Sequence, residues 1–308
     1  MEKEELLREI KNILMRGGYL IGVPVRKSMV FDLIARRDER ILIIKVLHNA
    51  DSLRAEMARE MKILGHEFNA SPLIVGFRSG AGPILDGVVY SRHGIPVISL
   101  KTFYDLIINE EQPMVYVAPG GFYVDIDGDT LRKIREERGL SLGELARMTG
   151  VTRKTIQLYE EGMSSTVDIA LKLEEFLNVD LIKPVDVFSF ADLSEERTAL
   201  DNVIFEDVFR RLMEIGYDVF LTLKCPFEAI SRDRTEVMLT GFEDNEKKLK
   251  YKAQNIRIFS EILEKKGFIV MSDSEYEEYN GVAIITRSEI MSYDKEEINK
   301  IVNERSDL

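Results

Sequence analysis

The segment FDLIARRDERILIIKV, Phe31 to Val46, joins two strand-like runs through a short polar turn. The pattern returns 196 residues later in FEAISRDRTEVMLTGF, Phe227 to Phe242, and the two segments align without a gap. A phenylalanine, an acid (Asp32 or Glu228), an isoleucine, a small residue and an arginine fall in register. Repetition at a fixed offset indicates that one structural unit is present in two copies.

The residues around each segment support the repeat. A helix pattern with Leu6, Ile10, Ile13 and Leu14 on one face ends at Gly17-Gly18. Strands are then predicted over 19–23, 29–35 and 41–47, followed by a helix to Phe68 with Asp51 or Ser52 as its cap, and by a strand in PLIVGF. The predicted helix 247–266 matches 53–68, and NGVAIITR at Asn280 is aligned with DGVVYSR at Asp86.

This pattern predicts a mixed α/β fold, with helices packed on a central sheet, in both copies. The predicted domains are an α/β domain at 1–112, a hairpin linker at 113–127, an all-α domain at 128–186 and a second α/β domain at 195–308. The fold class is therefore two related α/β (α+β) domains with mixed sheets around a helical centre.

Composition excludes several classes of protein. The 308 residues carry a net charge of −12 and are 45% hydrophobic, as in ordinary soluble proteins. Cys225 is the only cysteine, which excludes a disulfide framework and a cysteine zinc site within one chain. The histidines show no ligand spacing. The acidic start and the lack of a long apolar run favour a cytoplasmic protein without membrane association.

The order of elements over residues 3–78 resembles the restriction-endonuclease-like fold, and within it the archaeal Holliday-junction resolvases. That resemblance implies a divalent metal held by a helix glutamate, an aspartate and a Glu-x-Lys pair. Asp32 and Lys45 match the aspartate and the lysine, but Ile43 replaces the glutamate of Glu-x-Lys and the helix glutamate falls near Leu7.

The second copy keeps an acid, Glu228, but Leu239 and Gly241 replace the second acid and the lysine. One carboxylate cannot hold a hard cation in an all-protein site. The sequence therefore predicts no catalytic residue, no metal and no cofactor. Asp32 is expected to be a structural acid paired with Arg36, and the fold to serve packing, dimerisation or partner binding.

Two weaker motifs have plain structural interpretations. The loop RSGAGP, with Gly80 and Gly82, lacks the full glycine fingerprint of a phosphate loop and is predicted to be a surface loop. Asp125, Asp127 and Asp129 have the spacing of a calcium loop, but Thr130 occupies the glycine position, so a strand end and a helix cap are predicted.

The helical centre carries the most specific pattern. Ser141 and Glu144 form a predicted capping box, and Gly150 ends the short helix that they begin. Thr152 is placed to cap a second helix, with Val151 and Ile156 as a hydrophobic staple. On this second helix, Ile156 and Tyr159 face inward toward Leu145 and Ala146, which leaves Arg153, Lys154, Gln157 and Leu158 outward.

Two short helices that meet at a tight turn make a helix-turn-helix. The block from Leu131 to Asn178 resembles the Cro/C1-type family. Its matching features are Leu140-Ser141, Glu144-Leu145-Ala146, Gly150-Val151, Thr155-Ile156 and Tyr159-Glu160-x-Gly162. Leu142 departs from the family, which often has a phosphate-binding glutamine there.

The resemblance implies that the second helix reads double-stranded DNA. The DNA-binding residues that it implies are Arg153, Lys154, Thr155, Gln157, Leu158, Thr152, Ser141 and Leu142. Residues 142–158 carry a local charge of +2 on a chain of −12, which favours DNA docking over a plain helical bundle with solvated charges.

The whole arrangement resembles a family of archaeal transcriptional regulators. It implies a sequence-specific DNA-binding regulator that is a homodimer and not an enzyme, with the general transcription machinery as a further partner. The pseudo-symmetry of the two copies leaves a monomer as the alternative to the homodimer. Two other classes stay open at this point. One is a metal-dependent or structure-specific nuclease that the helix-turn-helix directs to DNA, and the other is a ligand-sensing module, for which the sequence shows no pocket signature.

Overall fold

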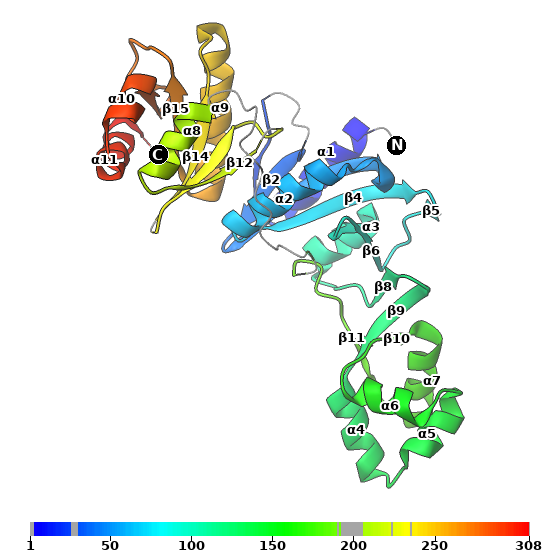
Figure 1. The fold of residues 1–308 in the computed structure, drawn as a ribbon. Helices are drawn as coiled ribbons and strands as arrows, with labels where there is room; N and C mark the ends of the chain where they lie inside the picture. Colours follow the sequence, from blue (N-terminus) through cyan, green and yellow to red (C-terminus); the bar gives the residue numbers. More distant parts are fainter. Residues whose placement is uncertain are drawn as a thin grey trace. The chain divides into compact units, whose positions relative to one another are not determined.

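The computed structural model describes residues 3–25, 30–189, 191, 206–222, 224–234 and 236–307 (Figure 1). The chain divides into two compact units. The flanking unit contains residues 1–46, 53–73 and 192–308, and the central unit contains residues 47–52 and 74–191. The predicted start of the second strand at Met29 and the predicted start of the last domain at 195 lie outside the described residues.

The flanking unit holds the first elements of the first copy: α1 (Lys3–Arg16), β1 (Leu20–Gly22), β2 (Leu33–Arg37), β3 (Arg40–Asn49) and α2 (Ala55–Glu67). Helix α1 buries Leu6, Ile10, Ile13 and Leu14, as their spacing predicts. It stops where Gly18 adopts a left-handed φ of 77°. Strands β1, β2 and β3 pair antiparallel in chain order.

The same unit holds the second copy: α8 (Glu206–Glu214), β12 (Asp218–Leu221), β13 (Ala229–Arg232), β14 (Val237–Phe242), α9 (Glu246–Leu263), β15 (Lys266–Met271), β16 (Glu278–Tyr279), β17 (Val282–Thr286), α10 (Arg287–Ser292) and α11 (Lys295–Arg305). Strands β12, β13 and β14 pair antiparallel, as β1 to β3 do. Strand β15 then runs parallel to β14 and to β17. Apolar side chains of α8, α10, α11 and the sheet form the core of this copy.

The central unit begins with η1 (Ala50–Ser52), β4 (Ser71–Ser79), β5 (Gly82–Pro83), β6 (Val88–Arg92), β7 (Ile95–Ile98), α3 (Leu100–Tyr104) and the π-helical turn η2 (Asp105–Asn109). Strand β7 is parallel to β4 and antiparallel to β6. The segment RSGAGP is not an open loop, because Arg78 pairs with Pro83 and Ser79 with Gly82 in a short hairpin.

The pairings correct the predicted end of the repeat. Strand β17 is parallel to β15, and β7 is parallel to β4, whereas β6 is antiparallel to its neighbour β7. Segment 280–286 therefore corresponds to 93–99 and not to 86–92. Backbone geometry agrees, because His93-Gly94 and Asn280-Gly281 all have positive φ. The alignment with DGVVYSR was wrong because both segments contain a Gly-Val pair.

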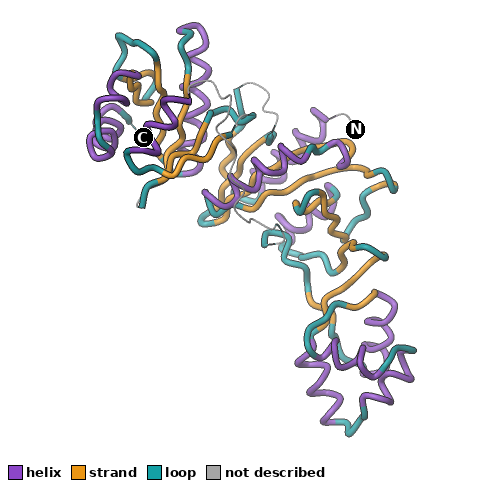
Figure 2. Tube along the Cα trace, viewed as in Figure 1, coloured by secondary structure: helices purple, strands orange, loops and turns teal. Residues whose placement is uncertain are grey.

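The rest of the central unit is a hairpin followed by helices (Figure 2). Its elements are β8 (Val115–Ala118), β9 (Gly121–Ile126), α4 (Gly128–Glu137), α5 (Leu142–Thr149), α6 (Arg153–Glu160), β10 (Ser165–Thr166), α7 (Val167–Leu177) and β11 (Ile182–Lys183). To the predicted helices the structure adds β10 and β11, which both pair with β9. The β8–β9 hairpin and the helices share one apolar core, which includes Val124 and Ile126 of β9 and Leu173 and Leu177 of α7.

One predicted cap is wrong. The N-cap of α2 is Arg54, whose side chain makes no capping hydrogen bond, while Asp51 and Ser52 lie in the 3-10 turn η1. The carboxylate of Asp51 instead accepts the backbone N–H of Gly80 at 2.5 Å. The fold is mixed α/β with two mixed sheets and a central helical block. No helix within the described ranges has the length and apolar character needed to span a membrane.

Candidate nucleic-acid interface

Helix α5 is fixed at both ends by local hydrogen bonds. Ser141 Oγ accepts the N–H of Glu144 at 3.2 Å, and Glu144 Oε2 accepts the N–H of Ser141 at 2.7 Å. These two bonds form the predicted capping box. The N–H and the hydroxyl of Ser141 hold the pKa of Glu144 below its ordinary value. Gly150 ends the helix with a φ of 79°, which a residue with a side chain rarely adopts.

Helix α6 begins at Arg153, three residues after Gly150, with Thr152 as its N-cap. Thr152 Oγ1 accepts the N–H of Thr155 at 3.1 Å, and the two threonine hydroxyls lie 2.8 Å apart. Ile156 and Tyr159 are buried in the same core as Leu145 and Ala146, as predicted. This packing fixes which face of α6 is exposed. Arg153, Lys154 and Gln157 are on that face.

Arg153 lies across the start of α5. A Cβ placed on Gly143 would be 2.8 Å from Arg153 Nε, so the arginine guanidinium occupies the space beside this glycine. The guanidinium therefore lies near the N-terminal ends of both α5 and α6. Lys154 is exposed, and its side chain makes no ion pair with any residue that the structure describes. Two cations therefore stand at the start of α6, where helix N–H groups also attract anions.

Other predicted site residues have mixed surroundings. The amide of Gln157 donates to Glu161 Oε1 at 2.9 Å, on the exposed face. Leu158 is half-buried and not fully outward. Leu142 is also half-buried, and its side chain packs against the helical core. Thr152, Thr155 and Ser141 use their hydroxyls in the caps. Leu142 is thus better described as a packing residue that bounds the interface.

A buried ion pair that the sequence did not reveal anchors α6. Glu160 is buried, and Arg135 of α4 donates to it twice, from Nε to Oε1 at 2.5 Å and from Nη2 to Oε2 at 3.1 Å. Arg132 adds a hydrogen bond to the Glu160 carbonyl at 3.2 Å. The Glu160 carboxylate raises the pKa of Arg135 above its ordinary value. A bidentate pair of this kind fixes orientation, so α4 sets the angle of α6.

Gly128 is a second determinant that the sequence did not reveal. It is the first residue of α4, and a Cβ there would lie 2.5 Å from the carbonyl oxygen of Tyr159 and 2.6 Å from that of Glu160. Only glycine permits this approach of α4 to the end of α6. The preceding residue, Asp127, caps α4 by accepting the N–H of Thr130 at 3.2 Å, which supports the predicted strand end and helix cap.

The nuclease-like position in the first copy has a structural use. Asp32 Oδ1 accepts from Lys3 Nζ at 2.7 Å, and Asp32 Oδ2 accepts the backbone N–H of Val46 at 2.8 Å. Lys45 Nζ lies 3.6 Å from Oδ2, and burial lowers the pKa of this lysine. The predicted Asp32–Arg36 pair is wrong, because Arg36 pairs with Glu264.

The second copy repeats this arrangement. Glu228 Oε2 accepts the backbone N–H of Phe242 at 2.7 Å, and Glu228 Oε1 pairs with Lys252. In both copies the acid thus links the start of one strand to an amide 14 residues later.

The donor set does not fit the divalent metal that this fold implies. Ile43 is fully buried, and both oxygens of Asp32 already accept hydrogen bonds from the protein. Among the described residues, no three His, Cys, Asp or Glu side chains are grouped as metal ligands.

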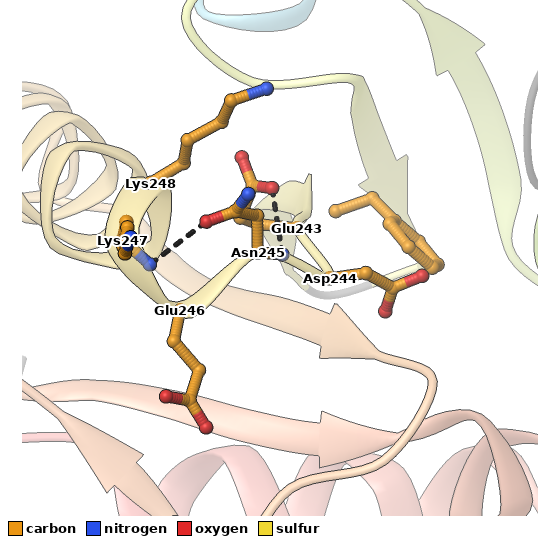
Figure 3. A pocket seen from close by; sticks show the side chains of 7 residues that line it. Glu243, Asp244, Asn245, Glu246, Lys247 and Lys248 are labelled. Atoms are coloured by element: carbon orange, nitrogen blue, oxygen red, sulfur yellow. Dashed lines mark hydrogen bonds between the residues drawn. The ribbon is translucent and has the colours of Figure 1, made fainter.

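Figure 3 shows an open hollow at the start of α9, lined by residues 242–248. Its polar groups bind one another. Asn245 Oδ1 accepts the N–H of Lys247, and Glu243 Oε1 accepts the N–H of Asn245, both at 3.0 Å. Asp244 Oδ1 accepts the N–H of Ser272 at 2.7 Å. Acidic and basic side chains both line the hollow, namely Glu243, Asp244, Glu246, Lys247 and Lys248, so it favours no ligand class.

Comparison with known families matches both parts of the chain. Residues 3–113 match the PD-(D/E)XK superfamily domain, and residues 131–183 match a helix-turn-helix domain. No solved structure matches the chain.

Relatives that align over nearly the whole chain come from archaea and are named "Putative HTH-type transcriptional regulatory protein". The relative from Archaeoglobus fulgidus is 36% identical over 93% of both chains. The one from Methanocella arvoryzae is 34% identical over all of this chain and 95% of its own. The one from Thermoplasma acidophilum is 34% identical over 99% of both. The chain therefore belongs to this family of archaeal HTH-type transcriptional regulatory proteins.

Proposed function

We propose that this protein is a sequence-specific transcription regulator that reads double-stranded promoter or operator DNA through α6. The observation that carries the proposal is the start of α6, where Arg153 and Lys154 stand on the exposed face of a helix whose opposite face is fixed in the core. In helix-turn-helix proteins the N-terminal residues of the second helix meet base edges in the major groove. The names of the relatives agree with this role.

The proposed roles follow from the side-chain chemistry. Arg153 is assigned to a guanine, whose O6 and N7 accept two hydrogen bonds from one guanidinium. Lys154 is assigned to a phosphate, because a flexible ammonium acts as a point charge. Gln157 is placed one turn further along for an adjacent base pair. Thr152, Thr155 and Ser141 are assigned to backbone contacts near the two helix starts, and Leu158 to the edge of the interface.

We propose a homodimer as the DNA-binding form. One short recognition helix reads few base pairs, and helix-turn-helix dimers read two half-sites about 34–36 Å apart. Light scattering on the operator complex should give the mass of two chains per duplex. A single chain of 35.4 kDa on the duplex would contradict the dimer.

We propose further that neither nuclease-like copy cleaves DNA and that both serve assembly or partner binding. The support is the donor set, because Ile43 and Leu7 stand where two oxygen ligands would be needed, and Asp32 is used within the protein. The general transcription machinery is the proposed partner, and the cytoplasm, where an archaeal promoter lies, the proposed location.

The test is incubation with branched and duplex DNA in Mg²⁺ or Mn²⁺, alongside titration of the same duplexes. Binding without cleavage is the expected result. Cleavage that disappears in Asp32→Ala would favour a nuclease directed by its helix-turn-helix, and cleavage that persists in this variant would indicate a contaminant.

A further inference from the structure

Inside the flanking unit, two hydrogen bonds join the copies, and each bond has an equivalent in the opposite direction. The backbone N–H of Val25, after β1, donates to Asn255 Oδ1 of α9 at 2.8 Å. The backbone N–H of Lys224, after β12, donates to Glu60 Oε2 of α2 at 3.0 Å. Strands β1 and β12 are equivalent in the repeat, as are helices α2 and α9. Each copy therefore gives a loop amide to the other copy's helix and accepts one in return.

The ion pairs between the copies show the same exchange. Arg36 Nη2 of β2 lies 2.7 Å from Glu264 Oε2, directly after α9. Arg232 Nη1 of β13 donates to Glu67 Oε1, the last residue of α2, at 3.2 Å. Arg36 and Arg232 are the two arginines that align in the 196-residue repeat. A residue and its repeat equivalent thus make the same contact in opposite directions.

Apolar packing closes the contact. The rings of Phe31 and Phe259 meet edge to face, with centroids 5.3 Å apart. Gly22 of β1 lies against α9, where an added Cβ would be 3.0 Å from Ile262 Cγ1. Glu60 and Asn255 are 5% and 7% exposed. The faces of α2 and α9 that carry these residues are therefore covered.

Reciprocal contacts, in which residue i meets j and the equivalent of j meets the equivalent of i, are the mark of an isologous two-fold interface. We propose that the second copy is the built-in dimer partner of the first, so that one chain contains a pseudo-symmetric pair and fills this interface by itself. The surface is specific for a copy of the same fold. A homodimer of the whole chain would then have to form through a different surface.

The test uses charge reversal at the Arg232–Glu67 pair in the full-length chain. Glu67→Arg and Arg232→Glu should each lower the melting temperature by roughly 5 °C or more, because each places two like charges side by side at a largely buried position. The double variant should recover most of the loss, since the pair is restored within one chain. Co-expression of the two single variants should recover none, because the partners would then lie on different chains.

Two outcomes overturn the proposal. Recovery in the co-expressed mixture would place the interface between chains, and additive losses in the double variant would show that the pair does not form. Glu261→Arg, at an exposed position of α9 whose ion pair with Arg257 stays within the helix, is the matched control and should change the melting temperature by no more than about 1 °C. If a charge reversal prevents folding, Arg36→Gln and Glu264→Gln at the more exposed pair are used in its place. The two substitutions are then compared in one chain and on two co-expressed chains, and a double-mutant cycle gives their interaction energy.

Discussion

Lys154 and Arg153 are neighbours on the first turn of α6, but the structure gives them different surroundings. Arg153 lies against Gly143, whereas Lys154 is exposed without such a neighbour among the glycines that the structure describes. A planar guanidinium with several donors suits base recognition, and a compact ammonium on a flexible stem suits a phosphate. The two residues should therefore differ in how their removal affects specificity and salt dependence.

Lys154→Ala should weaken binding to all DNA sequences to a similar extent. It should also reduce the slope of log affinity against log salt by about 0.9, the value for one lost phosphate contact. The measurement is titration of one duplex at several salt concentrations. Lys300→Ala, an exposed lysine on α11 that pairs with Glu304, is the control and should leave the slope unchanged. An unchanged slope in Lys154→Ala would show that this lysine does not contact a phosphate.

Two glycines provide a matched comparison of packing and recognition. At Gly128 an added Cβ would meet backbone carbonyls of α6, which cannot move cheaply, so Gly128→Ala should destabilise the protein by about 1–3 kcal/mol. At Gly143 the Cβ would meet only the flexible Arg153 side chain. Gly143→Ala should therefore keep stability near wild type and still reduce DNA affinity. Urea unfolding measures the stability of each variant, and DNA titration measures its affinity. Equal losses of stability in Gly128→Ala and Gly143→Ala would contradict the different roles assigned to the two glycines.

At the scale of elements, the cap of α4 gives a pH-dependent prediction. Hydrogen bonds from the backbone and side chain of Thr130 hold the pKa of Asp127 below its ordinary value of about 4. A folded-state pKa below the unfolded one adds stability above the unfolded pKa, and this stability is lost as the pH falls through the folded value.

Asp127→Asn keeps a capping side chain but removes the charge. Wild type should therefore be more stable than this variant by a constant amount from about pH 7 to pH 5, and the difference should shrink below about pH 4. Urea unfolding across this range is the measurement. A difference that stays constant to about pH 3 would show that the Asp127 carboxylate is not held by the cap.

Local signals predicted the recognition elements because the atoms involved are close in sequence. The Ser141–Glu144 box and the Thr152 cap each join residues three positions apart, and both are present. Contacts between distant residues could not be predicted. The Glu160–Arg135 pair joins residues 25 apart, and Asp51 leaves its expected capping role for the N–H of Gly80, 29 residues away. Arg36 likewise pairs with the distant Glu264 and not with Asp32, the local partner that was predicted.

At the scale of the whole molecule, residues that align between the two nuclease-like copies make structural contacts in both. Asp32 and Glu228 each bind a strand amide, and Arg36 and Arg232 each bind the other copy. The repeated sequence predicted the two copies, because apolar periodicity survives in both. The departure of Ile43 from the metal-ligand pattern was also visible in the sequence. The reciprocal pairing was not, because it depends on contacts between segments about 200 residues apart.

The central claim is that α6 reads DNA sequence, and its most direct test is selection of duplexes from a random pool by the full-length protein and by Arg153→Ala. Wild type should enrich one motif. The variant should bind that motif about 1–3 kcal/mol more weakly and lose preference at a guanine position while keeping the rest. The account is contradicted if wild type enriches no motif, or if Arg153→Ala enriches the same motif with the same affinity.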